Sequence, residues 1–107
     1  MSQTPAPGRI VHYKLSEDDA LAINNRRRDY SRASYDRFDA GVEEATGAQC
    51  HIGNGVRAGE WFSAIVVRYW ANDLVNLQVF LDGNDTLWVT SVSEGEGERH
   101  WQWPPRI

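Results

Sequence analysis

Four side chains in this sequence are of types that ligate metals or attack substrates: Cys50, His51, His12 and His100. Structural zinc sites need four ligands at closely paired spacings such as C-x2-C, and one Cys beside one His is no such pair. A catalytic Cys50 would need an exposed thiolate and a third group that orients its base. The sequence identifies neither. We therefore predict no metal and no cofactor, with Cys50 buried as a small apolar residue and His51 hydrogen-bonded in a strand.

Two acidic residues, Asp82 and Asp85, could in principle act as a general acid and base. They flank Gly83-Asn84, and the chemistry of a tight turn already explains both. No nucleophile, base and orienting group can be named together anywhere in the chain. The sequence therefore predicts a protein that is not an enzyme.

A basic cluster holds five of the eleven Lys and Arg residues on one predicted helix: Arg26, Arg27, Arg28, Arg32 and Arg37. Such a cluster could bind phosphate groups or an acidic protein. Successive residues point around a helix in steps of about 100°, and these arginines alternate with aspartates. A solvated helix face is thus the favoured interpretation, and Arg27 and Arg28 remain the candidates for binding.

Five tryptophans in 107 residues exceed what a small core needs. Tryptophan is enriched at binding hot spots because it buries a large rigid area and keeps an N–H donor. We expect Trp61, Trp70 and Trp88 to divide between core and surface. Trp101 and Trp103 should share one face of a last short strand.

Trp88 is predicted to be exposed because it shares a strand face with Thr86 and Thr90. The predicted binding surface therefore combines aromatic and basic side chains. Its members are Arg27, Arg28, Trp88, Trp101 and Trp103.

Three consecutive runs, residues 56–70, 75–83 and 85–92, predict antiparallel strands. In the second run apolar residues alternate with polar ones, as in a strand with one buried face. Its predicted core residues are Val75, Leu77, Val79 and Leu81, with Phe80 as an exception on the polar side. The first run is apolar on both faces over residues 61–70, which predicts a strand covered on both sides.

The segment Asp82-Gly83-Asn84-Asp85 predicts the hairpin turn between the second and third runs, because these residues tolerate the positive φ that such turns require. A turn at residues 71–73 is expected to join the first two runs. Residues 93–98, SEGEGE, predict a solvated loop.

The N-terminal part predicts an extended arm over residues 1–8, a first strand over residues 9–15 and then a helix. Ser16 followed by Glu17, Asp18 and Asp19 is typical of a helix N-terminus with a capping-box pairing between Ser16 and Asp19. The helix should run from Glu17 to about Phe38. Its apolar stripe is thin: Ala20, Ile23, Tyr30 and Ser34, completed by Leu21 or by the stem of Arg27. Residues 41–59 predict a glycine-rich loop that includes a short strand at 49–52.

Residues 9–107 form one predicted domain, which is long enough to bury roughly 65% of its unfolded surface. A single cysteine excludes an internal disulfide, and neither a signal peptide nor a long apolar run is present. These features predict a cytoplasmic protein with no membrane contact. The net charge of −4 argues against generic nucleic-acid binding.

About five short strands with one helix inserted after the first predict an α+β, mainly β fold, a small SH3-like antiparallel barrel. Residues 56–83, from VRAGEW through VFLDG, resemble the core of Tudor and related SH3-like modules. The chain also resembles a group of small proteins encoded by phages of actinobacteria. The resemblance lies in PGRIVHY (7–13), HIGN (51–54), NLQVFLDGNDTLW (76–88) and WQWPPRI (101–107). The resemblance implies a phage origin, and hence the host cytoplasm or the virion, without implying an activity.

Three functions fit these observations. The first is a noncatalytic binding or accessory module that engages a protein, either another molecule or a second copy of the chain. The second is a counter-defence protein that binds a small nucleotide signal, with Trp stacking on a base and Arg27 or Arg28 meeting phosphate. The third is a virion component whose N-terminal arm runs along neighbouring subunits.

Overall fold

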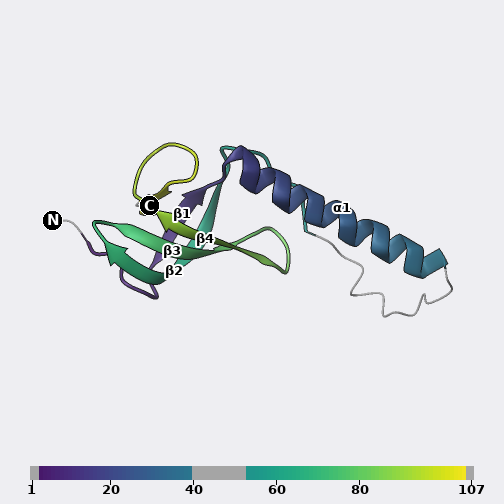
Figure 1. Cartoon of the computed structure of the whole chain (residues 1–107), viewed down its shortest axis with the longest axis horizontal. Helices are drawn as coiled ribbons and strands as arrows, with labels where there is room; N and C mark the ends of the chain where they lie inside the picture. Colours follow the sequence, from purple (N-terminus) through teal and green to yellow (C-terminus); the bar gives the residue numbers. More distant parts are fainter. Residues whose placement is uncertain (1–2, 40–52, 106–107) are drawn as a thin grey trace.

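The computed structural model describes residues 3–39 and 53–105, with the backbone alone for residues 30–39. These residues form one α-helix and five β-strands (Figure 1). The elements in chain order are β1 (Ile10–Lys14), α1 (Glu17–Asp39), β2 (Trp61–Ala71), β3 (Leu74–Phe80), β4 (Thr86–Val92) and β5 (Trp101–Gln102). The predicted strand at 49–52 lies outside the described residues.

The strands make one antiparallel sheet in the order β4-β3-β2-β1-β5. The chain just after β4 then pairs with β5, since the Trp101 N–H donates to Ser93 O (3.1 Å) and the Gly95 N–H donates to Trp101 O (3.0 Å). These bonds join the two ends of the sheet into a small barrel-like structure. The predicted α+β, mainly β fold with one helix after the first strand is confirmed.

The barrel interior is filled by side chains from every strand, and in β1, β2 and β3 these are alternate residues, as the period of two requires. In β4 the buried residues are Val89 and Val92. Tyr13 and Trp101 are its largest fully buried side chains. The predicted core face of β3 is confirmed, because Val75, Leu77, Val79 and Leu81 are all buried.

Strand β2 is not covered on both sides, contrary to the prediction. Only Ala64 and Val66 are buried, whereas Val67, Tyr69 and Trp70 are exposed. Pairing with β1 ends at Ile10↔Ile65, and the register with β3 shifts just after Val66. The helix projects from one end of the barrel and does not cover the outer side of the sheet (Figure 1).

The tight hairpin turn with positive φ angles is the one between β2 and β3. Asn72 (φ 52°) and Asp73 (φ 66°) form the two-residue loop between the paired residues Ala71 and Leu74, as a hairpin with twisted strands favours. The β3–β4 hairpin is placed as predicted, but Gly83 has no positive φ. Its loop spans residues 81–85, which is long enough to reverse the chain without one.

Gly83 is needed instead for a close approach between backbones. A Cβ atom there would lie 2.8 Å from the Cα of Gly53 and 3.0 Å from Nη2 of Arg27. The sequence correctly singled out this glycine, but the reason is packing between two loops and the helix.

The predicted helix start and length are confirmed. The Asp19 N–H donates to Ser16 Oγ (3.1 Å), and the Ser16 N–H donates to Asp19 Oδ2 (3.0 Å), which completes the capping box. Tyr13 Oη also donates to Asp19 Oδ2, at 2.5 Å, so the cap is tied to the barrel core. The pKa of Tyr13 lies far above its usual value, mainly because the hydroxyl is buried and secondly because it makes this hydrogen bond to Asp19.

The helix packs on the barrel by a narrow seam. Ala20, Ile23 and Arg27 are buried, whereas Leu21 is 58% exposed. Of the two candidates that could complete the apolar stripe, the stem of Arg27 therefore does so. The side chains of Tyr30 and Ser34 lie outside the described residues.

The N-terminal segment is attached to its own barrel through Pro5 and the Gly8 N–H, whereas the other residues from 3 to 8 are exposed. Pro5 is fully buried, and the Gly8 N–H donates to Val66 O (2.8 Å). Gly8 has φ 95°, a conformation that glycine adopts easily, and the chain turns there into β1. The Arg9 guanidinium lies 5.1 Å from the ring centre of Trp103.

We predict that Gly83→Ala lowers the free energy of unfolding by about 1–3 kcal/mol, because the added methyl group overpacks a backbone contact. Gly97→Ala is the matched control, since a Cβ there meets only His100 Cδ2 at 3.6 Å, and it should change stability by less than about 0.5 kcal/mol. Urea unfolding followed by circular dichroism measures both. Equal midpoints for the two variants would contradict the close approach at Gly83.

Candidate functional site

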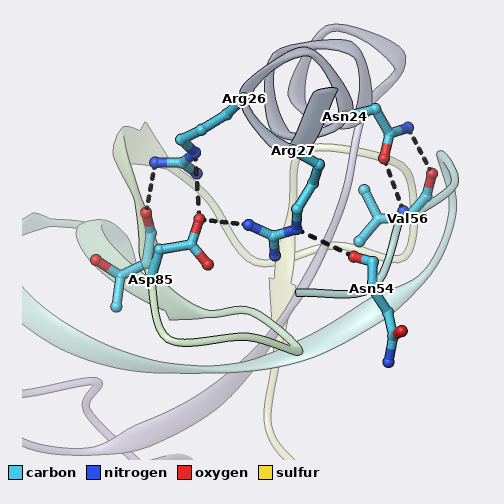
Figure 2. Close-up of polar contacts among 7 residues, drawn as sticks. Asn24, Arg26, Arg27, Asn54, Val56 and Asp85 are labelled. Carbon is cyan, nitrogen blue, oxygen red and sulfur yellow. Dashed lines mark hydrogen bonds and ion pairs between the residues drawn. The ribbon is translucent and has the colours of Figure 1, made fainter. Parts of the chain in front are cut away.

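A cluster of polar contacts, here called the arginine clamp, fixes the helix to the barrel (Figure 2). Arg27 Nη1 lies 2.6 Å from Asp85 Oδ2, and Arg26 Nε lies 3.2 Å from the same oxygen. Arg27 Nε donates to Asn54 O (3.3 Å), and Arg26 Nη1 donates to Thr86 O (3.3 Å). One carboxylate of the β3–β4 loop thus holds two successive arginines of α1.

Asn24 adds a second anchor one turn earlier in the helix (Figure 2). Its Nδ2 donates to Val56 O (2.8 Å), while its Oδ1 accepts from the Val56 N–H (2.9 Å). The amide therefore pairs with both backbone groups of Val56 in the way that a neighbouring strand would. The segment before β2 is held against α1 by this pair of bonds.

The structure separates the two predicted arginine candidates. Arg27 is 8% exposed and bound to Asp85, so it is a structural group of the helix seam. Arg28 is exposed. The interpretation of the cluster as a solvated helix face fits Arg28 and is wrong for Arg27. Arg27 follows the core residue Ile23 by four residues, and this spacing could have indicated that both lie on the same, buried face of the helix.

The acidic residues of the predicted turn make structural contacts, with Asp85 Oδ1 buried and without a hydrogen-bond partner. Asp85 serves the arginine clamp, and Asp82 accepts a bond from Asn54 Nδ2 (2.7 Å). His100 Nδ1 lies 3.1 Å from Ser93 O. Within residues 3–29 and 53–105, no group of three or more His, Cys, Asp or Glu is arranged to hold a metal ion. Cys50 and His51 lie outside the described residues.

The tryptophans are not distributed as predicted. Trp61, Trp70 and Trp88 are all exposed, so they do not divide between core and surface. Trp101 is the core tryptophan, and its Nε1 donates to Asp73 O (2.9 Å) at the tip of the β2–β3 hairpin. Trp103 is half-buried and packs edge-on against Trp101, with ring centres 5.2 Å apart.

Trp88 is exposed as predicted, at 61%, and lies in a continuous row across four strands. The pairings Ile10↔Ile65, Ile65↔Gln78 and Gln78↔Trp88 place these side chains side by side on the outward side of the sheet. Phe80 is diagonal to Trp88, and Val67 follows Ile65 two residues later on β2. We call this surface the outer face; its members are Ile10, Ile65, Val67, Gln78, Phe80 and Trp88.

A rigid tryptophan borders the outer face. Trp70 Nε1 donates to Asn76 Oδ1 (3.0 Å), an oxygen that also accepts from the Ser91 N–H (2.8 Å). The Arg68 guanidinium lies 4.2 Å from the Trp70 ring centre, within the range of a cation–π contact. The sequence interpretation missed this pair, which the same-face spacing of Arg68 and Trp70 in β2 could have indicated.

The strands carry no carboxylate. The chain has 15 Asp and Glu residues, yet none lies in β1 to β5. Their only Lys and Arg residues are Lys14 and Arg68. The outer face is therefore aromatic and neutral, whereas the helix and loops of the described chain carry the acidic residues.

Fold and surface together define a small barrel-like α+β domain with an exposed aromatic sheet face. No family model, curated protein or solved structure matches the chain, so this class is assigned from the architecture. In the part of the chain that the structure describes, no helix is long and apolar enough to cross a membrane.

Replacing Arg27 with Ala should lower the free energy of unfolding by about 1–3 kcal/mol, because Asp85 loses a charged hydrogen-bond donor and the helix seam loses an apolar stem. Arg28→Ala, one residue away and exposed, should cost less than about 0.5 kcal/mol. Chemical denaturation of the two variants makes the comparison. A similar loss for both would show that the clamp does not hold the helix.

Proposed function

We propose that this chain is a noncatalytic binding module that engages a protein partner through the outer face. The observation that carries the proposal is Trp88, 61% exposed in a cross-strand row with apolar neighbours on β1 and β2. A rigid aromatic side chain in such a setting is the commonest kind of binding hot spot.

The amount of exposed apolar surface supports this proposal. Ile10, Val67 and Phe80 are 44–47% exposed, and each lies on the same outward side of the sheet as Trp88. Single exposed apolar residues are normal on a protein, but contiguous groups of them mark interaction sites. Four such residues on one face favour a surface that is covered in use.

The chemistry of the face also suits a protein partner. The centres of protein interfaces are poor in charged residues and rich in aromatic residues and arginine. The outer face has that composition, with Arg68 and Trp70 at its border, and polar residues lie opposite its aromatic residues in the cross-strand pairs Gln78↔Trp88 and Phe80↔Thr86. Neutral hydroxyl and amide groups supply hydrogen bonds for recognition.

The two alternatives have less support. Arg27 is bound to Asp85 and buried, so the nucleotide hypothesis loses one of its two phosphate-binding residues. Pro5 and the Gly8 N–H are held by the chain's own barrel, which leaves less of the arm to run along neighbouring virion subunits. The resemblance to small actinobacterial phage proteins favours an accessory role in the infected host cytoplasm.

Photo-crosslinking in living cells tests the proposal. A benzophenone amino acid at position 88 should form a protein adduct, because this position lies at the proposed contact. The same amino acid at position 21 is the matched control, since Leu21 is 58% exposed but lies on the helix. Equal labelling at both positions, or none at position 88, would count against the outer face as the binding surface.

A further inference from the structure

We infer that the partner is a second copy of this chain, and that two copies pack their outer faces together across a two-fold axis. This inference rests on the proposed function and names the molecule that covers the outer face. Three observations carry it: the area, the charge and the position of the face.

The area matches the apolar centre of a stable dimer. Trp88, Trp70, Phe80, Ile10 and Val67 are 44–61% exposed. A large aromatic side chain buries roughly 150–250 Å², so five side chains at about half exposure offer roughly 400–500 Å². A stable interface buries about 800 Å² on each partner, of which the rim is polar. Gln78, Thr86 and Thr90 add polar surface within the face, and the flanking residues would form the rest of the rim.

The charge favours self-association at this face over any other surface of the described chain. Two copies that each carry a net charge of −4 repel one another. Strands β1 to β5 contain no Asp or Glu. Packing sheet against sheet therefore places no strand carboxylate in the contact, and the one charged side chain of β2, β3 and β4 is Arg68, which lies against Trp70 at the border of the face.

The position of the outer face allows the sheets of two copies to approach each other closely. Helix α1 projects from one end of the barrel, away from the outward side of β2, β3 and β4 (Figure 1). Two sheets can pack at about 10 Å with their strands nearly aligned. Gln78 lies between Ile65 on β2 and Trp88 on β4. A two-fold axis through the centre of the face brings Gln78 of one copy close to Gln78 of the other, as an isologous interface requires.

Sedimentation velocity over a wide concentration range tests the inference. The wild-type chain should sediment as a dimer that dissociates on dilution. Gln78→Glu and Gln78→Lys should each weaken the dimer at least about tenfold, because like charges then face each other. An equimolar mixture of these two variants should restore a dimer, since opposite charges then meet.

Two further variants test whether the dimer depends on the outer face itself. Trp88→Thr removes an exposed side chain from the face and keeps good strand propensity, so it should weaken the dimer at least about tenfold without unfolding the barrel. Leu21→Gln changes an equally exposed apolar residue on the helix and should leave dimerisation unchanged. Circular dichroism confirms that each variant is folded.

Each outcome decides the question. A wild-type chain that stays monomeric at high concentration overturns the inference, and a crosslink from position 88 to a different protein would then still uphold the proposed function. A dimer that is insensitive to Gln78 and Trp88 forms through another surface and also overturns it. Loss of dimer in each single variant together with rescue in the Glu and Lys mixture establishes the two-fold contact.

Discussion

The shared carboxylate of Asp85 is the interaction on which the placement of the helix depends. Among residues 17–29, whose side chains the structure describes, helix α1 buries Ala20, Ile23 and the stem of Arg27 against the barrel, which is a narrow apolar seam. Asp85 compensates by binding Arg26 and Arg27, while Asn24 holds the segment before β2. Two loops distant in sequence therefore meet under one turn of helix, and their closeness explains why Gly83 has no room for a side chain.

Local patterns predicted the secondary structure well because their causes are local. The alternation from Val75 to Leu81 located β3, and the hydroxyl and carboxylate of Ser16 and Asp19 located the helix start. Which side of a strand is covered depends on the rest of the fold. The apolar run of β2 suggested two buried faces, but no element packs over Val67 and Trp70 among the described residues. Arg27 was ambiguous because its burial depends on the distant Asp85.

The same contrast separates the two kinds of tryptophan. Trp101 is buried because it pairs with β1 on one side and with the chain after β4 on the other, and its Nε1–H donates to Asp73 O. Trp88 and Trp70 have the side-chain chemistry of core residues but lie on the outward side of the sheet. Because acidic residues are confined to the helix and loops of the described chain, this outward side is a neutral aromatic surface on an acidic protein.

Pairing between Tyr13 and Trp101 joins segments near opposite ends of the described chain, whereas β2, β3 and β4 follow one another through short loops. Closing a long loop costs more conformational entropy than closing a short one, and distant pairings form slowly. The three-stranded meander is thus expected to form first, with β1 and β5 added last. Phe80 and Trp88 lie on this meander, whereas Ile10 on β1 joins the outer face later. The aromatic part of that face is therefore in place while the inner side of the meander is still open to other chains.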